Sequence, residues 1–125
     1  MNIFVLDNDV SKAAAYHCDK HVVKMCLEYA QLLSTTANHF LNERVGYKTT
    51  HINHPSAVWC RTSVENYTWL SDHLYALLDE YTYRYEKRHK CTDIAYTLQS
   101  PPKNLEAWDW TPMPSCMAEE YIVSD

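Results

Sequence analysis

The sequence predicts a mainly α-helical protein: a compact helical bundle that forms a single domain over residues 1–125. A short extended N-terminal segment and an irregular C-terminal tail rich in proline and tryptophan are expected to flank the helices. The chain has one glycine, Gly46, whereas proteins built from hairpins usually need glycine at several turns. Hydrophobic residues make up 46% of the 125 residues, which is enough for one core in a chain of this length.

The first part of the chain is expected to hold an extended segment, two helices and a loop. The apolar run 1–7 favours a buried extended segment, and the Asp-Asn-Asp run after it can cap a helix starting near Val10. Residues 19–40 lack glycine and proline and predict a long helix, for which Asp19 can serve as the N-cap. Residues 42–53 are polar and predict a loop.

A second helical region is expected to open at His54-Pro55, because proline suits the first turn of a helix. Its apolar periodicity continues to about Tyr81, and the basic run 87–90 is typical of a helix C-terminus. The pattern allows one long helix or two, with Thr62 or Ser63 capping the second.

The last part of the chain is expected to be mostly irregular. Thr92-Asp93 can start a short helix that stops before Pro101-Pro102. The tail from Lys103 then lies across the helices, with Trp108 and Trp110 as its anchors.

Composition limits where the protein works and what it binds. The chain has no run of about 18 apolar residues and no secretory signal, so the sequence predicts a cytoplasmic protein with no membrane partner. The five cysteines form no Cys-x-x-Cys pair, which favours reduced thiols over disulfides or a zinc finger. The net charge of −5 makes duplex DNA a less favoured partner, because DNA affinity comes largely from neutralising phosphates.

The helix predicted at 19–40 carries a narrow polar stripe. Apolar side chains cover an arc of roughly 200° on a helical wheel, and His21, Lys24, Glu28 and Gln31 share the remaining sector. Because a helix packed on most sides rarely turns its polar stripe to open solvent, we expect the stripe to face a cleft. His21 and Glu28 are therefore candidate catalytic residues, and Lys24 is a candidate phosphate ligand. The alternative is a minor solvated pair of Lys24 and Glu28.

His17 is a further candidate catalytic residue, in the pentapeptide His-Cys-Asp-Lys-His. Two histidines four residues apart can ligate a metal when they share a helix, but the zincin pattern needs glutamate where Cys18 stands. Asp19 as an N-cap would also separate the two histidines. The favoured interpretation is a site without metal, in which His17 and His21 donate protons or bind phosphate. A bound metal and a purely structural role are the alternatives.

Polar side chains also recur along one side of the second helical region, at Asn66, His73, Glu80 and Arg84. If this side faces the first long helix, His73 adds a catalytic base. Asn66 and Arg84 then add ligand-binding groups, Arg84 through its paired donors. The alternative is an interhelical salt-bridge network of Glu80 and Arg84.

Three more residues complete the candidate ligand-binding set. Trp59 and Trp69 can stack on a nucleobase, and His54 can contact a ligand or simply form a turn with Pro55. The run 80–90 mixes aromatic and basic residues, which can bind single strands, although an ordinary helix C-terminus is the favoured interpretation. The chain contains no glycine-rich phosphate loop, nucleophile elbow or dinucleotide fingerprint.

Four segments look like those of a group of small proteins encoded by tailed bacteriophages: MNIFVLD at 1–7, HCDKHVVKM at 17–25, NHPSAVW at 53–59 and EYTYRYEKRHK at 80–90. This resemblance covers about residues 1–120 and implies a phage protein in the host cytoplasm, without a particular activity. The early helix with His and Glu, together with the Asn-His-Pro stretch, resembles to a lesser degree the pyrimidine dimer DNA glycosylases. Those are compact helical repair enzymes with an amine nucleophile at the N-terminus.

The sequence leads to three functional hypotheses. The first is a protein that sequesters or hydrolyses a small phosphorylated nucleotide in a His/Lys/Glu/Arg pocket between helices. The second is a DNA-processing enzyme of glycosylase/lyase type, with a positive groove and steep salt dependence of binding. The third is a helical interaction protein without chemistry, whose polar stripe is an interhelical network. The sequence identifies no cofactor and leaves oligomeric state open.

Overall fold

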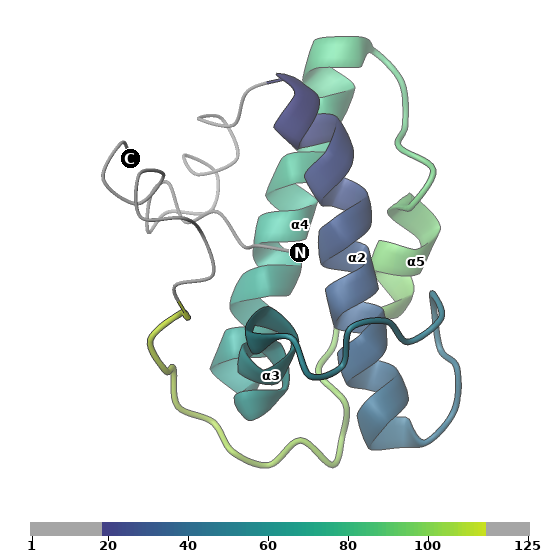
Figure 1. The fold of residues 1–125 in the computed structure, drawn as a ribbon. Coiled ribbons are helices and arrows are strands. Elements are labelled where there is room, and N and C mark those ends of the chain that lie inside the picture. The colour runs from purple at the N-terminus through teal and green to yellow at the C-terminus, as the bar shows by residue number, and fades with distance from the viewer. Residues whose placement is uncertain (1–18, 115–125) are drawn as a thin grey trace.

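The computed structural model describes residues 19–114, which form helices joined by loops (Figure 1). No strand occurs among these residues, so the mainly α fold class is confirmed. The extended segment predicted at 1–7, the helix predicted near Val10, and His17 lie outside the described residues. The helices are α2 (Asp19–Leu41), α3 (Pro55–Thr62), α4 (Val64–Tyr85) and α5 (Thr92–Thr97).

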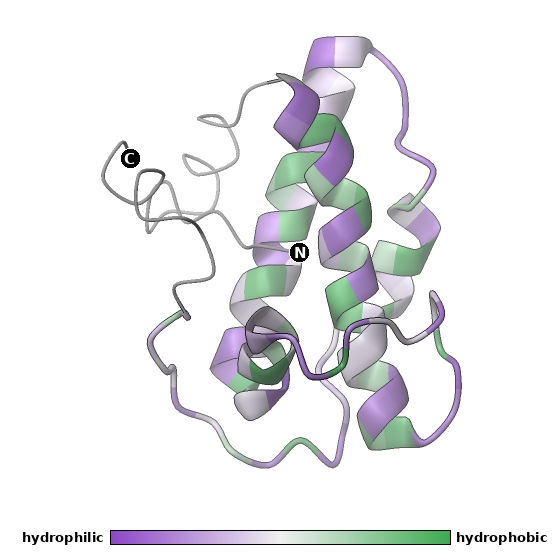
Figure 2. Ribbon diagram, viewed as in Figure 1, coloured by the Kyte–Doolittle hydropathy of each residue, from purple (hydrophilic) through white to green (hydrophobic). Residues whose placement is uncertain are grey.

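The long helices α2 and α4 pack side by side in opposite directions (Figure 1). Helix α3 packs against both, and α5 packs against α4. Figure 2 shows hydrophobic and hydrophilic residues interleaved along both long helices, as expected of amphipathic helices that share a core. The largest buried apolar side chains between them include Tyr29, Leu32, Leu33, Leu70, Leu74 and Leu77.

The broad apolar arc predicted for α2 is largely buried. Val22, Met25, Cys26 and Tyr29 are at most 4% exposed. The prediction is wrong at Val23, which is 41% exposed. The apolar arc is therefore narrower on that side than the wheel indicated.

The second helical region consists of two helices, and Ser63 separates them. Ser63 has an extended backbone (φ −154°, ψ 160°), and its Oγ accepts a hydrogen bond from Asn66 N at 3.1 Å. It therefore caps α4, as one of the two sequence alternatives proposed. The hydroxyl of Thr62, the other candidate cap, instead donates to Val58 O within α3.

The segment after α5 is irregular, as predicted, and it adds backbone hydrogen bonds to the start of α4. Val64 N donates to Ala107 O at 2.7 Å, and Glu65 N donates to Trp108 O at 3.0 Å. The Trp108 side chain is 66% exposed. The prediction that Trp108 anchors the tail is therefore wrong for its indole ring. The backbone carbonyl of Trp108 makes the contact with α4 instead. We call residues 103–114 the C-terminal segment.

Three cysteines of the described residues, Cys26, Cys60 and Cys91, are unbridged and buried. Burial raises the pKa of Cys26 and Cys60 to about 12, so both side chains stay protonated and unreactive thiols at neutral pH. None of the helices in residues 19–114 is long and apolar enough to cross a membrane.

Gly46 lies where the α2–α3 loop (residues 42–54) passes close to α2. A Cβ at this position would lie 2.6 Å from Ser34 Oγ and 3.0 Å from Ile94 Cγ2. Ser34 Oγ already accepts a hydrogen bond from Tyr47 N at 3.0 Å, so moving it away would break that bond. We expect Gly46→Ala to lower the free energy of unfolding by about 1–3 kcal/mol.

Urea unfolding of this variant and the wild type measures the loss. Glu43→Ala, at an exposed position of the same loop, is the control and should unfold like the wild type. A Gly46→Ala protein as stable as that control would contradict the proposed close packing.

Candidate functional site

The polar stripe of α2 lies between buried side chains and is itself only partly covered. His21, Glu28 and Gln31 are half-buried. Lys24 Nζ lies 3.9 Å from Glu28 Oε2, and the two side chains are 69% and 16% exposed. A ligand that bound over Lys24 would therefore lie next to the Glu28 carboxylate, to which water has little access. Such a group can move protons or stabilise a developing positive charge.

His73 lies in the core between α2 and α4 and is 0% exposed. Its ring centroid lies 5.1 Å from that of Tyr29 on α2 and 4.8 Å from that of Trp69 on α4. A catalytic base must reach the proton that it moves, so a catalytic role for His73 stays a prediction that requires this packing to open.

Arg84 lies at the end of α4 that packs against the start of α2. The contact of Tyr29 with His73 sets the register of the two helices, and Arg84 lies three turns beyond His73, roughly 16 Å. His21 lies about two turns from Tyr29 in the same direction, roughly 12 Å. Arg84 Nε is 2.9 Å from Glu80 Oε1, with side chains 18% and 21% exposed. This salt bridge lies within α4, four residues apart, whereas the alternative from the sequence was an interhelical network, which stays a prediction.

Asn66 and Trp59 hold the C-terminal segment at the other end of the helix pair. Asn66 Nδ2 donates to Trp59 O and to Thr111 Oγ1, both at 2.8 Å, and Asn66 Oδ1 accepts from Thr111 N at 3.0 Å. Trp59 Nε1 donates to Thr111 O at 2.9 Å. Since these polar groups bind the chain itself, a ligand-binding role for either residue stays a prediction.

His54 caps α3 at this same end. Its Nδ1 accepts a hydrogen bond from Ser56 N at 3.1 Å, so the turn role that the sequence allowed is present. Burial lowers the pKa of His54, which favours the neutral ring that this bond requires.

Trp69 belongs to a tryptophan cluster that connects α3, α4 and the C-terminal segment. Its ring centroid lies 6.3 Å from Trp59 and 5.9 Å from Trp110, and those two rings are 5.2 Å apart. Trp59 is 4% exposed, whereas Trp110 is 43% exposed and Trp69 is half-buried. The accessible faces for stacking on a base therefore belong to Trp69 and Trp110. Sequence reasoning did not single out Trp110 as a stacking residue, because only the tertiary fold brings it to Trp69.

Apart from the buried His73, the described candidate residues fall into two groups. The first comprises His21, Lys24 and Glu28, which follow one another from the first turn of α2 to the turn beside His73, and Arg84 at the end of α4 that lies toward the start of α2. The other group surrounds α3 and the start of α4, and comprises His54, Trp59, Asn66 and Trp69. Within residues 19–114, no three His, Cys, Asp or Glu side chains gather as a group that could hold a metal.

His89 is a buried polar residue near the first group that sequence reasoning missed. It is 7% exposed; its Nδ1 accepts from Cys91 N at 3.1 Å, and its Nε2 lies 3.3 Å from Val23 O. Because Nδ1 is the acceptor, the proton must lie on Nε2, which then donates to Val23 O. The neutral ring therefore connects the loop after α4 to the first turns of α2.

Stability is expected to depend on pH through His89. Burial lowers the pKa of His89 below its ordinary value, so the folded state favours the neutral ring. Its contribution is then complete above the unfolded pKa of about 6.5 and is lost as the pH falls through the lower folded pKa. We expect the wild type to lose more stability than His89→Gln between about pH 7.5 and pH 5 in urea unfolding. Parallel losses in the two proteins would contradict this.

Comparison with known proteins gives one family. The family model of the pyrimidine dimer DNA glycosylases matches residues 1–93 of the chain. No curated protein and no solved structure matches it. The matched range includes α2, α3 and α4, and hence both groups of candidate residues; the C-terminal segment lies outside it. Since the match covers most of the 125 residues, the chain belongs to the pyrimidine dimer DNA glycosylase family.

Proposed function

We propose that this protein is a DNA glycosylase/lyase that excises a damaged pyrimidine at the start of α2. The family match over residues 1–93 carries this proposal. The polar stripe supports it, because Glu28 is a largely covered carboxylate 3.9 Å from the amine of Lys24.

The proposed reaction begins when an amine nitrogen attacks C1′ of the damaged nucleotide. The C1′–N glycosidic bond breaks, and its electron pair leaves with the base, which takes up a proton. The attacking nitrogen loses a proton, and the C1′–O4′ bond then opens to form a C1′=N imine while O4′ gains a proton. The imine then loses a proton from C2′ and the C3′–O3′ bond breaks, so that the 3′ phosphate leaves and the strand is cut. Water finally hydrolyses the imine and regenerates the amine.

Each residue of the first group has a place in this scheme. Glu28 accepts the proton from the amine and returns one to O4′. Lys24 is one candidate amine; the resemblance to the glycosylases implies an N-terminal amine as the other, and that group lies outside the described residues. His21 and Arg84 contact the phosphates that flank the damaged nucleotide.

Incision of a defined substrate tests the proposal. The substrate is a duplex oligonucleotide with a single cyclobutane pyrimidine dimer, and the undamaged duplex is the control. We expect the strand to be cut at the dimer only. With borohydride present, the imine should be reduced to a stable protein–DNA adduct. Peptide mapping of that adduct then identifies the amine.

Absence of both incision and adduct on the dimer duplex would overturn the proposal. The nucleotide-binding hypothesis and a phage origin stay predictions, because the family match favours neither of them. The interaction-protein hypothesis is addressed by the Glu28 variant described in the Discussion.

A further inference from the structure

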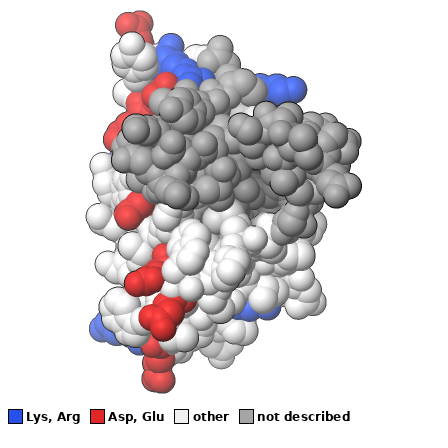
Figure 3. All heavy atoms as spheres, turned by 90° about the vertical axis from the view of Figure 1, so that its left-hand side faces the viewer, with Lys and Arg blue, Asp and Glu red and all other residues white. Residues whose placement is uncertain are grey.

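One face of α4 carries a row of acidic residues. Glu65, Asp72, Asp79 and Glu86 follow one another at intervals of seven residues along α4 and its C-cap, and all four are exposed. This spacing places them on one face of the helix. Figure 3 shows acidic side chains in a column along one edge of the molecule. A net charge of −5 therefore does not exclude a basic surface elsewhere.

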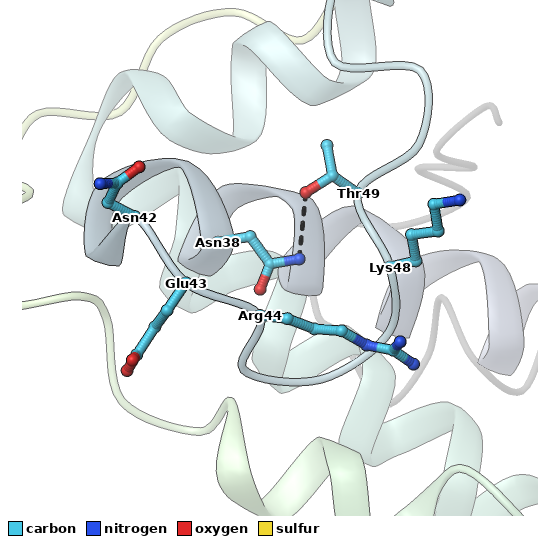
Figure 4. Close-up of a pocket in the computed structure, with 6 residues that line it drawn as sticks. All are labelled: Asn38, Asn42, Glu43, Arg44, Lys48 and Thr49. Carbon is cyan, nitrogen blue, oxygen red and sulfur yellow. Dashed lines mark hydrogen bonds between the residues drawn. The ribbon is translucent and has the colours of Figure 1, made fainter.

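The α2–α3 loop is held in one conformation by buried polar side chains of α2. Asn38 Nδ2 donates to Tyr47 O at 2.9 Å and to Thr49 Oγ1 at 3.1 Å, the latter bond drawn in Figure 4. Asn38 Oδ1 accepts from Val45 N at 2.7 Å. Thr35 Oγ1 also lies 3.2 Å from both Thr50 N and Thr50 O. These bonds explain why the second half of α2 buries polar residues.

The fixed loop presents two basic side chains, Arg44 and Lys48. Arg44 Nε donates to Gly46 O at 3.1 Å, which orients the guanidinium of this exposed residue. Figure 4 shows the charged ends of Arg44 and Lys48 on the same side of the loop, while the carboxylate of Glu43 points away from them. The loop therefore presents two cations on one side before any ligand arrives.

Two hollows beside this loop include Arg44, Lys48 and Thr49. One, of about 340 Å³, is the hollow in Figure 4. The other, of about 440 Å³, is lined by no Asp or Glu and reaches Gln31. Gln31 is the last residue of the polar stripe and lies one turn beyond Glu28, roughly 5 Å along α2. The basic hollow thus reaches to within about one helical turn of Glu28.

We propose that Arg44 and Lys48 bind backbone phosphates of the DNA strand, a few nucleotides from the damaged base at Glu28. This inference rests on the proposed function and adds to it the surface that positions the strand. The Arg44 guanidinium can bind phosphate oxygens through paired donors, and Lys48 adds a point charge. Asn38 acts as a positioning residue, because it holds the loop on which both cations lie.

The DNA affinity of the double variant Arg44→Gln/Lys48→Gln tests this inference. Fluorescence anisotropy with the dimer duplex, between about 50 and 200 mM salt, gives the dissociation constant and its salt dependence. Loss of two phosphate contacts should reduce the slope of log affinity against log salt by about 1.8. Because neither residue is placed at the reacting atoms, the loss of affinity should exceed any loss in the single-turnover incision rate at saturating DNA.

Lys87→Gln/Lys90→Gln is the matched control, since it removes the same charge from exposed positions between α4 and α5. The inference is supported if the loop variant binds at least about tenfold more weakly than this control at low salt. It is overturned if both variants lose affinity equally or if neither does. Failure of the proposed function would look different, because the wild type itself would then leave the dimer duplex uncut.

Discussion

Glu28→Gln is expected to lower the single-turnover rate of base excision by about 10²–10⁴-fold. The amide keeps the size of the carboxylate and can still form hydrogen bonds, but it cannot accept the amine proton. Glu28 is 16% exposed, so little water reaches the position from which a substitute base would act. The affinity for the dimer duplex should change far less, because a neutral side chain at this position does not repel phosphate.

Asp79→Asn is the control for Glu28→Gln. It makes the same change of charge at an exposed position of α4 and should leave the rate unchanged. Thermal melting of both variants separates chemistry from stability. If Glu28→Gln melts at a lower temperature yet incises at the wild-type rate, Glu28 serves an interhelical network, and the interaction-protein hypothesis gains support.

Asn66→Leu is expected to lower the free energy of unfolding by about 3 kcal/mol. The new side chain has nearly the same volume but removes the bonds to Trp59 O, Thr111 Oγ1 and Thr111 N. Asn66 is 0% exposed, so the main-chain partners left in the interior lose their hydrogen bonds without gaining water. The C-terminal segment should also be cleaved faster by proteases, because one of its attachments to α4 is gone.

Urea unfolding, followed by tryptophan fluorescence, measures this loss. Asn104→Leu is the comparison, because Asn104 is exposed and donates one hydrogen bond, to Phe40 O; we expect a loss of at most about 1 kcal/mol. DNA affinity of folded Asn66→Leu decides between two roles. An unchanged dissociation constant supports a structural role, whereas a tenfold increase with little loss of stability would support the predicted ligand-binding role.

Much of the helical architecture could be predicted from the sequence, because helices depend on local features. The absence of glycine and proline in 19–40 predicted α2, and the cap at Ser63 was one of two alternatives for the start of α4. The polar stripe of His21, Lys24, Glu28 and Gln31 follows from helical spacing alone. In the structure His21, Glu28 and Gln31 are half-buried and Lys24 is exposed; that the stripe faces a cleft stays a prediction.

The tertiary structure decided which of these side chains lie together. Asn66 meets Thr111 and His89 meets Val23 across separations of 45 and 66 residues, which no local pattern encodes. The periodicity of α4 predicted that His73 lies on the same face of the helix as Asn66 and Arg84. In the structure, His73 is buried between Tyr29 and Trp69. Arg84 lies at the opposite end of α4 from Asn66. Helical spacing specifies the face of a helix, whereas the partner of that face depends on how the whole chain packs. The sequence by itself therefore determined the helices and the stripe, and the fold determined what surrounds them.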